Sequence, residues 1–153
     1  MIKVEQSIVI DRPPSEVFAF VGDQTNAPRW QRGLETVRRV GGGPIGVGTR
    51  HEFVRSMIGR RMSGENEYTR FDPDRCVAFT ATSGGWPLQA SYDVGPAGEH
   101  ATRLILRIAL HPPGPVRILQ PLFAAALRRD VRTNLGSLKA LLEASNGRQS
   151  SPA

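Results

Sequence analysis

The sequence has a single cysteine and lacks long hydrophobic runs. Cys76 alone excludes an internal disulfide and a multi-cysteine metal site. No apolar run approaches the roughly 20 residues that a membrane helix needs, and the segment that Met1 begins has no signal-peptide character. We therefore expect a cytoplasmic protein that has no stable membrane insertion and uses neither a metal nor a cofactor.

Acidic charge is also in short supply, because 14 Asp and Glu face 20 Lys and Arg, for a net charge of +6. Arginine supplies nearly all of the positive charge, since lysine occurs only at Lys3 and Lys139. Such a surplus can attract phosphates or an acidic partner. However, no basic block is longer than a pair, and aromatic residues do not interleave with the arginines as they do in nucleic-acid binders. We therefore expect no nucleic-acid partner.

The sequence does contain a long amphipathic segment from Val116 to Glu143. Its apolar residues recur at i+3 and i+4 and share one arc of a helical wheel: Leu119, Phe123, Leu127, Val131, Leu135, Leu138 and Leu142. A helix of this length must bury its stripe against another layer, and a sheet is the natural partner. Residues 145–153 follow as a flexible tail.

The preceding residues read as strands with two short helical segments. Residues 2–10 alternate between apolar and polar, which predicts a half-buried strand. A helix carrying Val17, Phe18 and Val21 and a turn of helix at residues 26–30 come next. Six further strands are predicted near residues 34–40, 49–57, 61–71, 77–81, 86–94 and 101–111. The sequence thus predicts one α+β domain, residues 2–144, in which a curved antiparallel sheet wraps around a long C-terminal helix.

This order of elements resembles the helix-grip fold of the START/Bet v 1-like (SRPBCC) superfamily. The segments at residues 11–18, 26–30, 47–50, 71–73 and 138–142 are similar to the bacterial polyketide cyclase/dehydrase branch. The resemblance covers residues 2–144. It implies that a small hydrophobic molecule binds in a cavity between the concave face of the sheet and the long helix.

Polar residues on otherwise apolar faces are the candidates for chemistry, because an unpartnered buried polar group costs about 1–3 kcal/mol. Asn134 falls inside the apolar arc of the helix, where it would bond either a ligand or a structural partner. His51 shares a strand face with Phe53 and Arg55. It is either a general base or a surface or hydrogen-bonded histidine.

The resemblance adds Arg70 to these candidates. Aromatic polyketide cyclases place a cavity arginine just before the turn that matches residues 71–73, and an asparagine in the last helix, and Arg70 and Asn134 are similar to those positions. Glu65 and Glu67 share a strand face that either points inward, where the pair could do acid/base work, or is the solvated convex face; in the second case Asn66, Tyr68 and Arg70 point inward. An inward arginine would hold an enolate or polarise a carbonyl during ring closure. The alternative is an exposed charge at the end of a strand.

Aromatic and apolar residues on the faces expected to line the cavity are candidate ligand contacts: Trp30, Phe53, Tyr68, Trp86, Tyr92, Phe123, Leu127 and Val131. Other site motifs are missing. His51, His100 and His111 have no metal-ligand spacing. The glycine-rich stretch at residues 41–48 matches neither the P-loop nor the dinucleotide fingerprint.

Two functions follow from these candidates. The first is a carrier, a monomer or homodimer, that holds a small hydrophobic, aromatic or polyketide-like molecule or a lipid without changing it. The alternative is a polyketide cyclase or dehydratase that catalyses aldol-type ring closure or dehydration in the same cavity, assisted by Arg70, Asn134 or His51.

Overall fold

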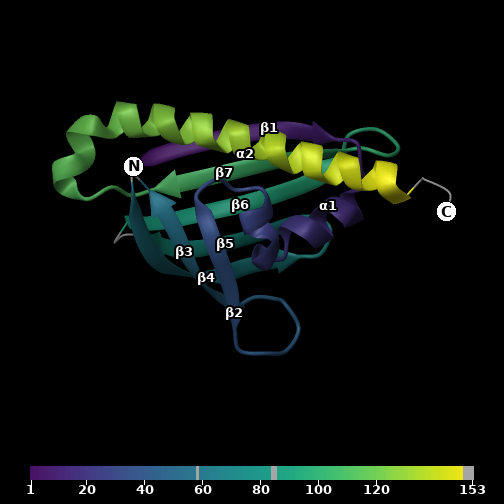
Figure 1. Ribbon diagram of the computed structural model, residues 1–153, viewed down its shortest axis with the longest axis horizontal. Coiled ribbons are helices and arrows are strands. Elements are labelled where there is room, and N and C mark those ends of the chain that lie inside the picture. Colours follow the sequence, from purple (N-terminus) through teal and green to yellow (C-terminus); the bar gives the residue numbers. More distant parts are fainter. Residues whose placement is uncertain (58, 84–85, 150–153) are drawn as a thin grey trace.

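The computed structural model describes residues 1–57, 59–83 and 86–149, and its elements follow the predicted order (Figure 1). Strand β1 (Ile2–Ile10) precedes helix α1 (Pro14–Val21) and the 3-10 helix η1 (Gln24–Arg29). Six strands follow: β2 (Leu34–Val40), β3 (Arg50–Met57), β4 (Arg60–Asp72), β5 (Cys76–Ser83), β6 (Trp86–Pro96) and β7 (Thr102–Leu110). A second 3-10 helix, η2 (Gly114–Leu119), leads into helix α2 (Gln120–Gln149). The α+β helix-grip prediction is confirmed.

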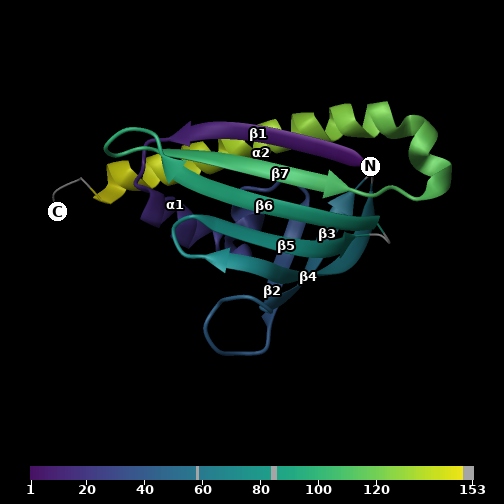
Figure 2. The ribbon, with the colours of Figure 1, turned by 180° about the vertical axis from the view of Figure 1, so that it is seen from behind.

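The strands form one antiparallel sheet in the order β1-β7-β6-β5-β4-β3-β2. Alternation along each strand sends apolar side chains, such as Val4 of β1 and Leu104 and Leu106 of β7, to one face. The helices lie on this concave face (Figure 1), and no helix of the described residues covers the opposite face (Figure 2). None of the described helices is both long enough and apolar enough to cross a membrane.

Helix α2 runs along β1, the strand at one edge of the sheet. Two of its side chains bond the backbone of that edge. Gln120 Nε2 donates to the carbonyl oxygen of Met1 at 2.6 Å, and Lys139 Nζ donates to that of Val9 at 2.7 Å. An uncovered edge strand would offer its free backbone groups to other chains. The helix therefore both supplies core side chains and protects this edge.

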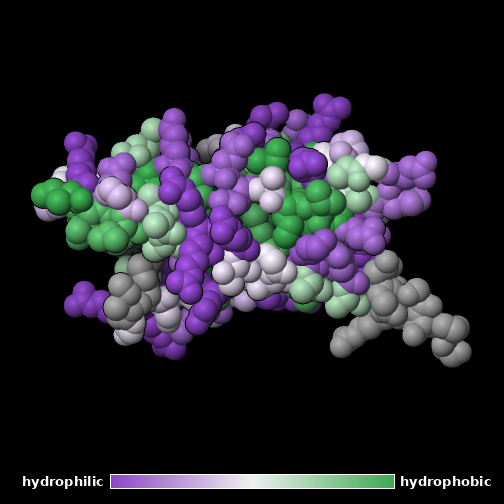
Figure 3. All heavy atoms as spheres, turned by 90° about the horizontal axis from the view of Figure 1, so that it is seen from above, coloured by the Kyte–Doolittle hydropathy of each residue, from purple (hydrophilic) through white to green (hydrophobic). Residues whose placement is uncertain are grey.

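The two halves of α2 are buried to different extents. Val131, Leu135, Leu138 and Leu142 are at most 9% exposed and join the core. The region where η2 meets α2 is far more open, with Ile118 87% and Leu122 68% exposed, and it forms an apolar cluster at one end of the molecule (Figure 3). Only the second half of the predicted stripe therefore packs tightly onto the sheet.

The helix also extends beyond its predicted end. Residues 145–149, expected in the tail, belong to α2, and residues 150–153 lie outside the described part of the chain.

Arg12 joins three elements near the C-terminal end of α2. The residue is only 6% exposed, and its Nε donates to the carbonyl oxygen of Leu142 at 2.9 Å. Its Nη1 pairs with Glu16 of α1 at 2.9 Å, and its own carbonyl oxygen accepts the hydroxyl of Thr102 at 2.6 Å. A buried charge with several partners fixes the position of each of them.

We expect Arg12→Met to lower the free energy of unfolding by about 1.5–3 kcal/mol, because it removes the charged hydrogen bond to Leu142 and the ion pair with Glu16. Urea titration measures the change. Arg103→Met is the matched control, because Arg103 is exposed on β7 and forms no ion pair within the described residues. Equal stability of the two variants would show that the Arg12 contacts do not hold α2.

Candidate functional site

A cavity of about 90 Å³ lies on the concave face of the sheet, beside η1 and the segment that follows it. Most of its lining is apolar: Leu34, Val37, Phe53, Phe79, Ala81, Leu88, Ala90, Leu106 and Ile108. Its polar members are Gln24, Gln31, Arg55, Asn66 and Tyr92. A water molecule needs roughly 10–15 Å³ of such space, whereas pockets for drug-sized ligands measure about 300–1,000 Å³. In this conformation the cavity therefore suits a compact guest.

Glycine at position 64 makes room for one wall of the cavity. A Cβ on Gly64 would lie 2.5 Å from Cζ of Phe53 and 2.2 Å from the carbonyl oxygen of Thr82. Both distances are far shorter than a normal van der Waals contact. The absence of a side chain thus lets the Phe53 ring lie directly against β4, its neighbour in the sheet.

Three polar side chains form a connected cluster in the cavity. Arg55 Nη2 donates to Gln31 Oε1 at 3.4 Å, and Gln31 Nε2 donates to the Tyr92 hydroxyl at 3.2 Å. Burial raises the pKa of Tyr92 to about 12, so its hydroxyl keeps its proton at neutral pH. Burial also lowers the pKa of Arg55, against the opposing effect of Tyr92 and Asp130. The cluster therefore presents hydrogen-bond donors to an oxygen atom in the cavity.

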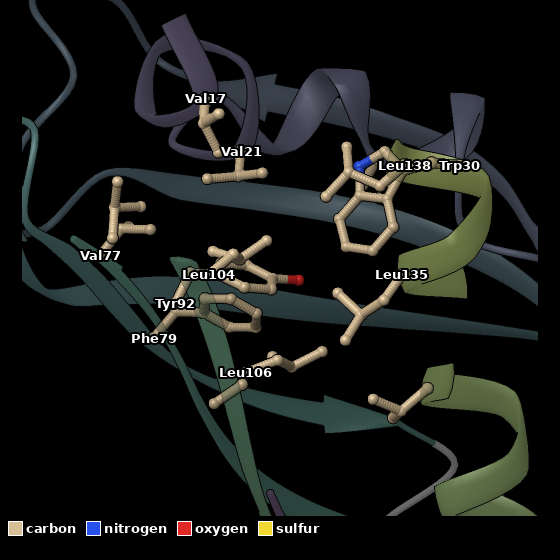
Figure 4. Close-up of a cluster of buried hydrophobic side chains, with 14 of the residues drawn as sticks. Val17, Val21, Trp30, Val77, Phe79, Tyr92, Leu104, Leu106, Leu135 and Leu138 are labelled. Carbon is tan, nitrogen blue, oxygen red and sulfur yellow. The ribbon is translucent and has the colours of Figure 1, made fainter. Parts of the chain in front are cut away.

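The core around Tyr92 holds this cluster in place. Trp30, only 4% exposed, meets the Tyr92 ring edge-on with 6.0 Å between ring centroids. Leu135 and Leu138 of α2 face Tyr92 and Leu106 of the sheet (Figure 4). Trp30 therefore fixes the position of the Tyr92 ring by packing against it. Trp30 itself is not among the residues that line the cavity.

His51 lies behind Asn66. It is fully buried, and its Nδ1 is 2.9 Å from Oδ1 of Asn66, which does line the cavity. Burial lowers the pKa of His51, although its bond to Asn66 and the charge of Asp23 oppose this effect. Its Nε2 has no hydrogen-bond partner among the described residues. The imidazole is therefore neutral near pH 7 and reaches the cavity only through Asn66.

Tyr68 has a structural role, because its hydroxyl bonds backbone atoms of another segment. Its hydroxyl donates to the carbonyl oxygen of Gly22 at 2.7 Å and accepts the backbone N–H of Gln24 at 3.2 Å. These bonds tie β4 to the corner between α1 and η1, and Tyr68 is not among the lining residues.

The expectation that Arg70 points into the cavity is wrong. The register of β4 against β5 shifts between Tyr68 and Arg70, so Arg70 no longer shares the inward face of Tyr68. Its side chain is 63% exposed and pairs with Asp72 at 3.4 Å. Arg55, two residues beyond Phe53 on β3, supplies the arginine of the cavity instead.

Asn134 makes a structural bond. Its Oδ1 accepts the backbone N–H of Arg32 at 3.1 Å, which joins α2 to the segment before β2. Asn134 is not among the lining residues, and neither is any other residue of α2.

The remaining predicted ligand contacts lie at different depths. Phe53 and Tyr92 line the cavity. Val131 is buried in the core, and Leu127 is half-buried. Trp86 and Phe123 pack edge-on with 5.4 Å between ring centroids, outside the lining.

Gln24 and Gln31 were missed because they lie in and just after η1, where no periodic pattern shows which way a side chain points. No group of three or more His, Cys, Asp or Glu side chains in the described ranges is arranged to hold a metal ion.

A curved sheet with a long helix beside an apolar cavity defines the helix-grip class of proteins. The family model described as "Polyketide cyclase / dehydrase and lipid transport" matches residues 1–143, and the chain belongs to this family. The predicted membership of the SRPBCC superfamily is thereby confirmed. No curated protein sequence is similar enough to count as a match.

Solved structures share the fold at low sequence identity. The protein TTHA0849 from Thermus thermophilus has a TM-score of 0.79 at 21% identity, over 97% of this chain and 99% of that one. The Zhui aromatase/cyclase from Streptomyces sp. R1128 has a TM-score of 0.76 at 15% identity, over 92% and 93% of the two chains. Ara h 8.0201 has a TM-score of 0.68 at 13% identity, over 93% and 97%.

The burial of His51 predicts a pH-dependent stability. Because its pKa is lower in the folded than in the unfolded chain, the unfolded chain binds more protons in acid. The contribution of His51 is therefore full above the unfolded pKa of about 6.5 and declines as the pH falls, by at most about 1.4 kcal/mol per pH unit. Urea titrations between about pH 5 and pH 8 should show a shallower pH dependence for His51→Gln than for the wild type. His111→Gln, at an exposed position, is the control and should keep the wild-type slope. Identical slopes for wild type and His51→Gln would contradict this assignment.

Proposed function

We propose that the protein binds a small hydrophobic or aromatic molecule in the concave-face cavity. The observation that carries this proposal is an apolar hollow in which the donors of one polar cluster, Gln31, Arg55 and Tyr92, converge. Ligand sites generally combine an apolar wall with a few placed polar groups. The family's description, which includes lipid transport, supports the same class of function.

The two kinds of lining residue have different roles in binding. Burial of apolar surface against residues such as Phe79, Leu106 and Ile108 supplies about 25 cal/mol per Å². The Tyr92 hydroxyl and the Arg55 guanidinium orient the ligand, because each bonds an oxygen only in a limited range of directions. A cavity of about 90 Å³ is smaller than the cavity of about 150 Å³ that binds benzene in an engineered protein, so this conformation favours a ligand no larger than one small ring.

Filling the cavity should abolish binding without unfolding the protein. Ala90 lines the cavity and is 7% exposed, so the larger side chain of Ala90→Leu would occupy the ligand's space. We expect the affinity for a small neutral probe such as benzene to fall by about tenfold or more, measured by NMR titration. Ala109→Leu, on the opposite face of the sheet, is the matched control. Unchanged benzene affinity in Ala90→Leu would place the binding site elsewhere.

Catalysis of ring closure or dehydration is the second candidate function. It is favoured by Tyr92, whose protonated hydroxyl could donate to a carbonyl oxygen beside Arg55. Two observations weigh against it. The cavity is small for a folded poly-carbonyl chain, and the one histidine near it, His51, lies behind Asn66 in the described structure.

Tyr92→Phe separates these two functions. A carrier should lose only the modest affinity of one hydrogen bond, about fivefold to tenfold. A catalyst that uses this hydroxyl should keep its binding and lose turnover of a poly-carbonyl substrate by about 10²-fold or more. Turnover by the wild type that Tyr92→Phe leaves unchanged would remove Tyr92 from the catalytic role.

A further inference from the structure

We propose that the ligand is a small apolar carboxylate whose head group binds Arg55. This inference rests on the proposed binding function and narrows it to one charge class. It starts from the state of Arg55, a half-buried cation that lines the cavity.

Arg55 is a half-buried arginine that has no anionic partner among the described residues. Arg38, Arg50 and Arg107 each pair with a carboxylate. Within the described residues, no carboxylate oxygen lies within 4.0 Å of a nitrogen of Arg55, whose side chain donates instead to the neutral amide of Gln31 at 3.4 Å. Removing a charge from water is unfavourable unless a counter-charge or strong hydrogen bonds compensate. An anionic ligand would supply that counter-charge.

A second donor lies beside the guanidinium. The Tyr92 hydroxyl accepts the amide N–H of Gln31 at 3.2 Å and also interacts with the side chain of Gln24, the other glutamine of the lining. An oxygen bound to Arg55 could accept a hydrogen bond from this hydroxyl while keeping the guanidinium contact. Two donors in one cavity suit a carboxylate, whose two oxygens accept bonds in one plane.

The charged and titratable groups near Arg55 define which anion fits. Tyr92 and Asp130 are the two titratable groups whose electrostatic interaction with Arg55 raises its pKa. Of these two, Tyr92 is neutral at pH 7. Asp130, exposed on α2, lies beyond ion-pair distance and opposes the entry of a second negative charge. The single positive charge of Arg55 therefore balances a ligand with one negative charge. A phosphate monoester carries about −1.5 to −2 at pH 7, which is more negative charge than one guanidinium neutralises.

The experiment compares an acid with its uncharged amide. Benzoate and benzamide have nearly the same shape, and isobutyrate and isobutyramide repeat the test with a smaller apolar body. Proton–nitrogen correlation NMR of the full chain gives the affinity of each, with the Arg55 Nε–H as the local reporter. We expect the wild type to bind each acid about tenfold or more tightly than its amide, the advantage of a charged hydrogen bond.

Three variants assign the preference to this residue. Arg55→Met should remove the preference, so that each acid and its amide bind with similar affinity, and Arg55→Lys should retain part of the preference. Asp130→Asn should strengthen acid binding at low salt by about twofold to fivefold, because a competing negative charge is gone. Amide binding by Arg55→Met also reports whether that variant is folded.

The outcomes distinguish this inference from the function on which it rests. Equal wild-type affinity for acids and amides, or an acid preference that survives in Arg55→Met, would overturn the carboxylate assignment and leave the binding function standing. Failure of all four compounds to bind would overturn both. If Arg55→Met fails to fold, the assignment is tested by two other results. Tighter binding of the acids than of the amides by the wild type, and stronger acid binding by Asp130→Asn, would support it, and the absence of either would overturn it.

Discussion

The attachment of α2 to the edge strand β1 determines which part of the concave face the helix covers. Side chains of the helix bond the backbone at both ends of β1, through Gln120 and Lys139. Because the helix is held over this edge, its buried leucines fill only part of the concave face. The cavity lies in the part that remains, and no residue of α2 lines it.

The two ends of the concave face differ in how tightly their side chains are packed. Near α1, buried residues such as Val17, Val77 and Leu104 pack tightly, and Arg12 joins α1, β7 and the end of α2. Toward β2 and β3, small side chains and polar groups replace this packing, and the cavity forms. A well-packed region thus holds the backbone rigid, while an under-packed region of the same sheet provides space for a ligand.

The sequence predicted the fold because its patterns are periodic. Alternation along the strands and the i+3, i+4 stripe of the helix reflect which faces are buried. The strand pattern agrees with the structure, and so does the second half of the stripe, from Val131 to Leu142. The site was harder to predict because it depends on departures from periodicity. One register shift after Tyr68 turned Arg70 to the solvent, and Asn134 found its partner in an irregular segment. Arg55 was visible in the strand pattern beside Phe53, but the pattern could not show that no carboxylate in the described part of the chain pairs with it.

The helix leaves an apolar hollow on the concave face that is able to accept a small molecule. Crystals pressurised with xenon test this most directly, because xenon occupies dry apolar cavities without requiring any hydrogen bond. We expect xenon density bounded by Phe79, Leu106 and Ile108. Side chains that fill this space and leave no xenon density there would contradict it.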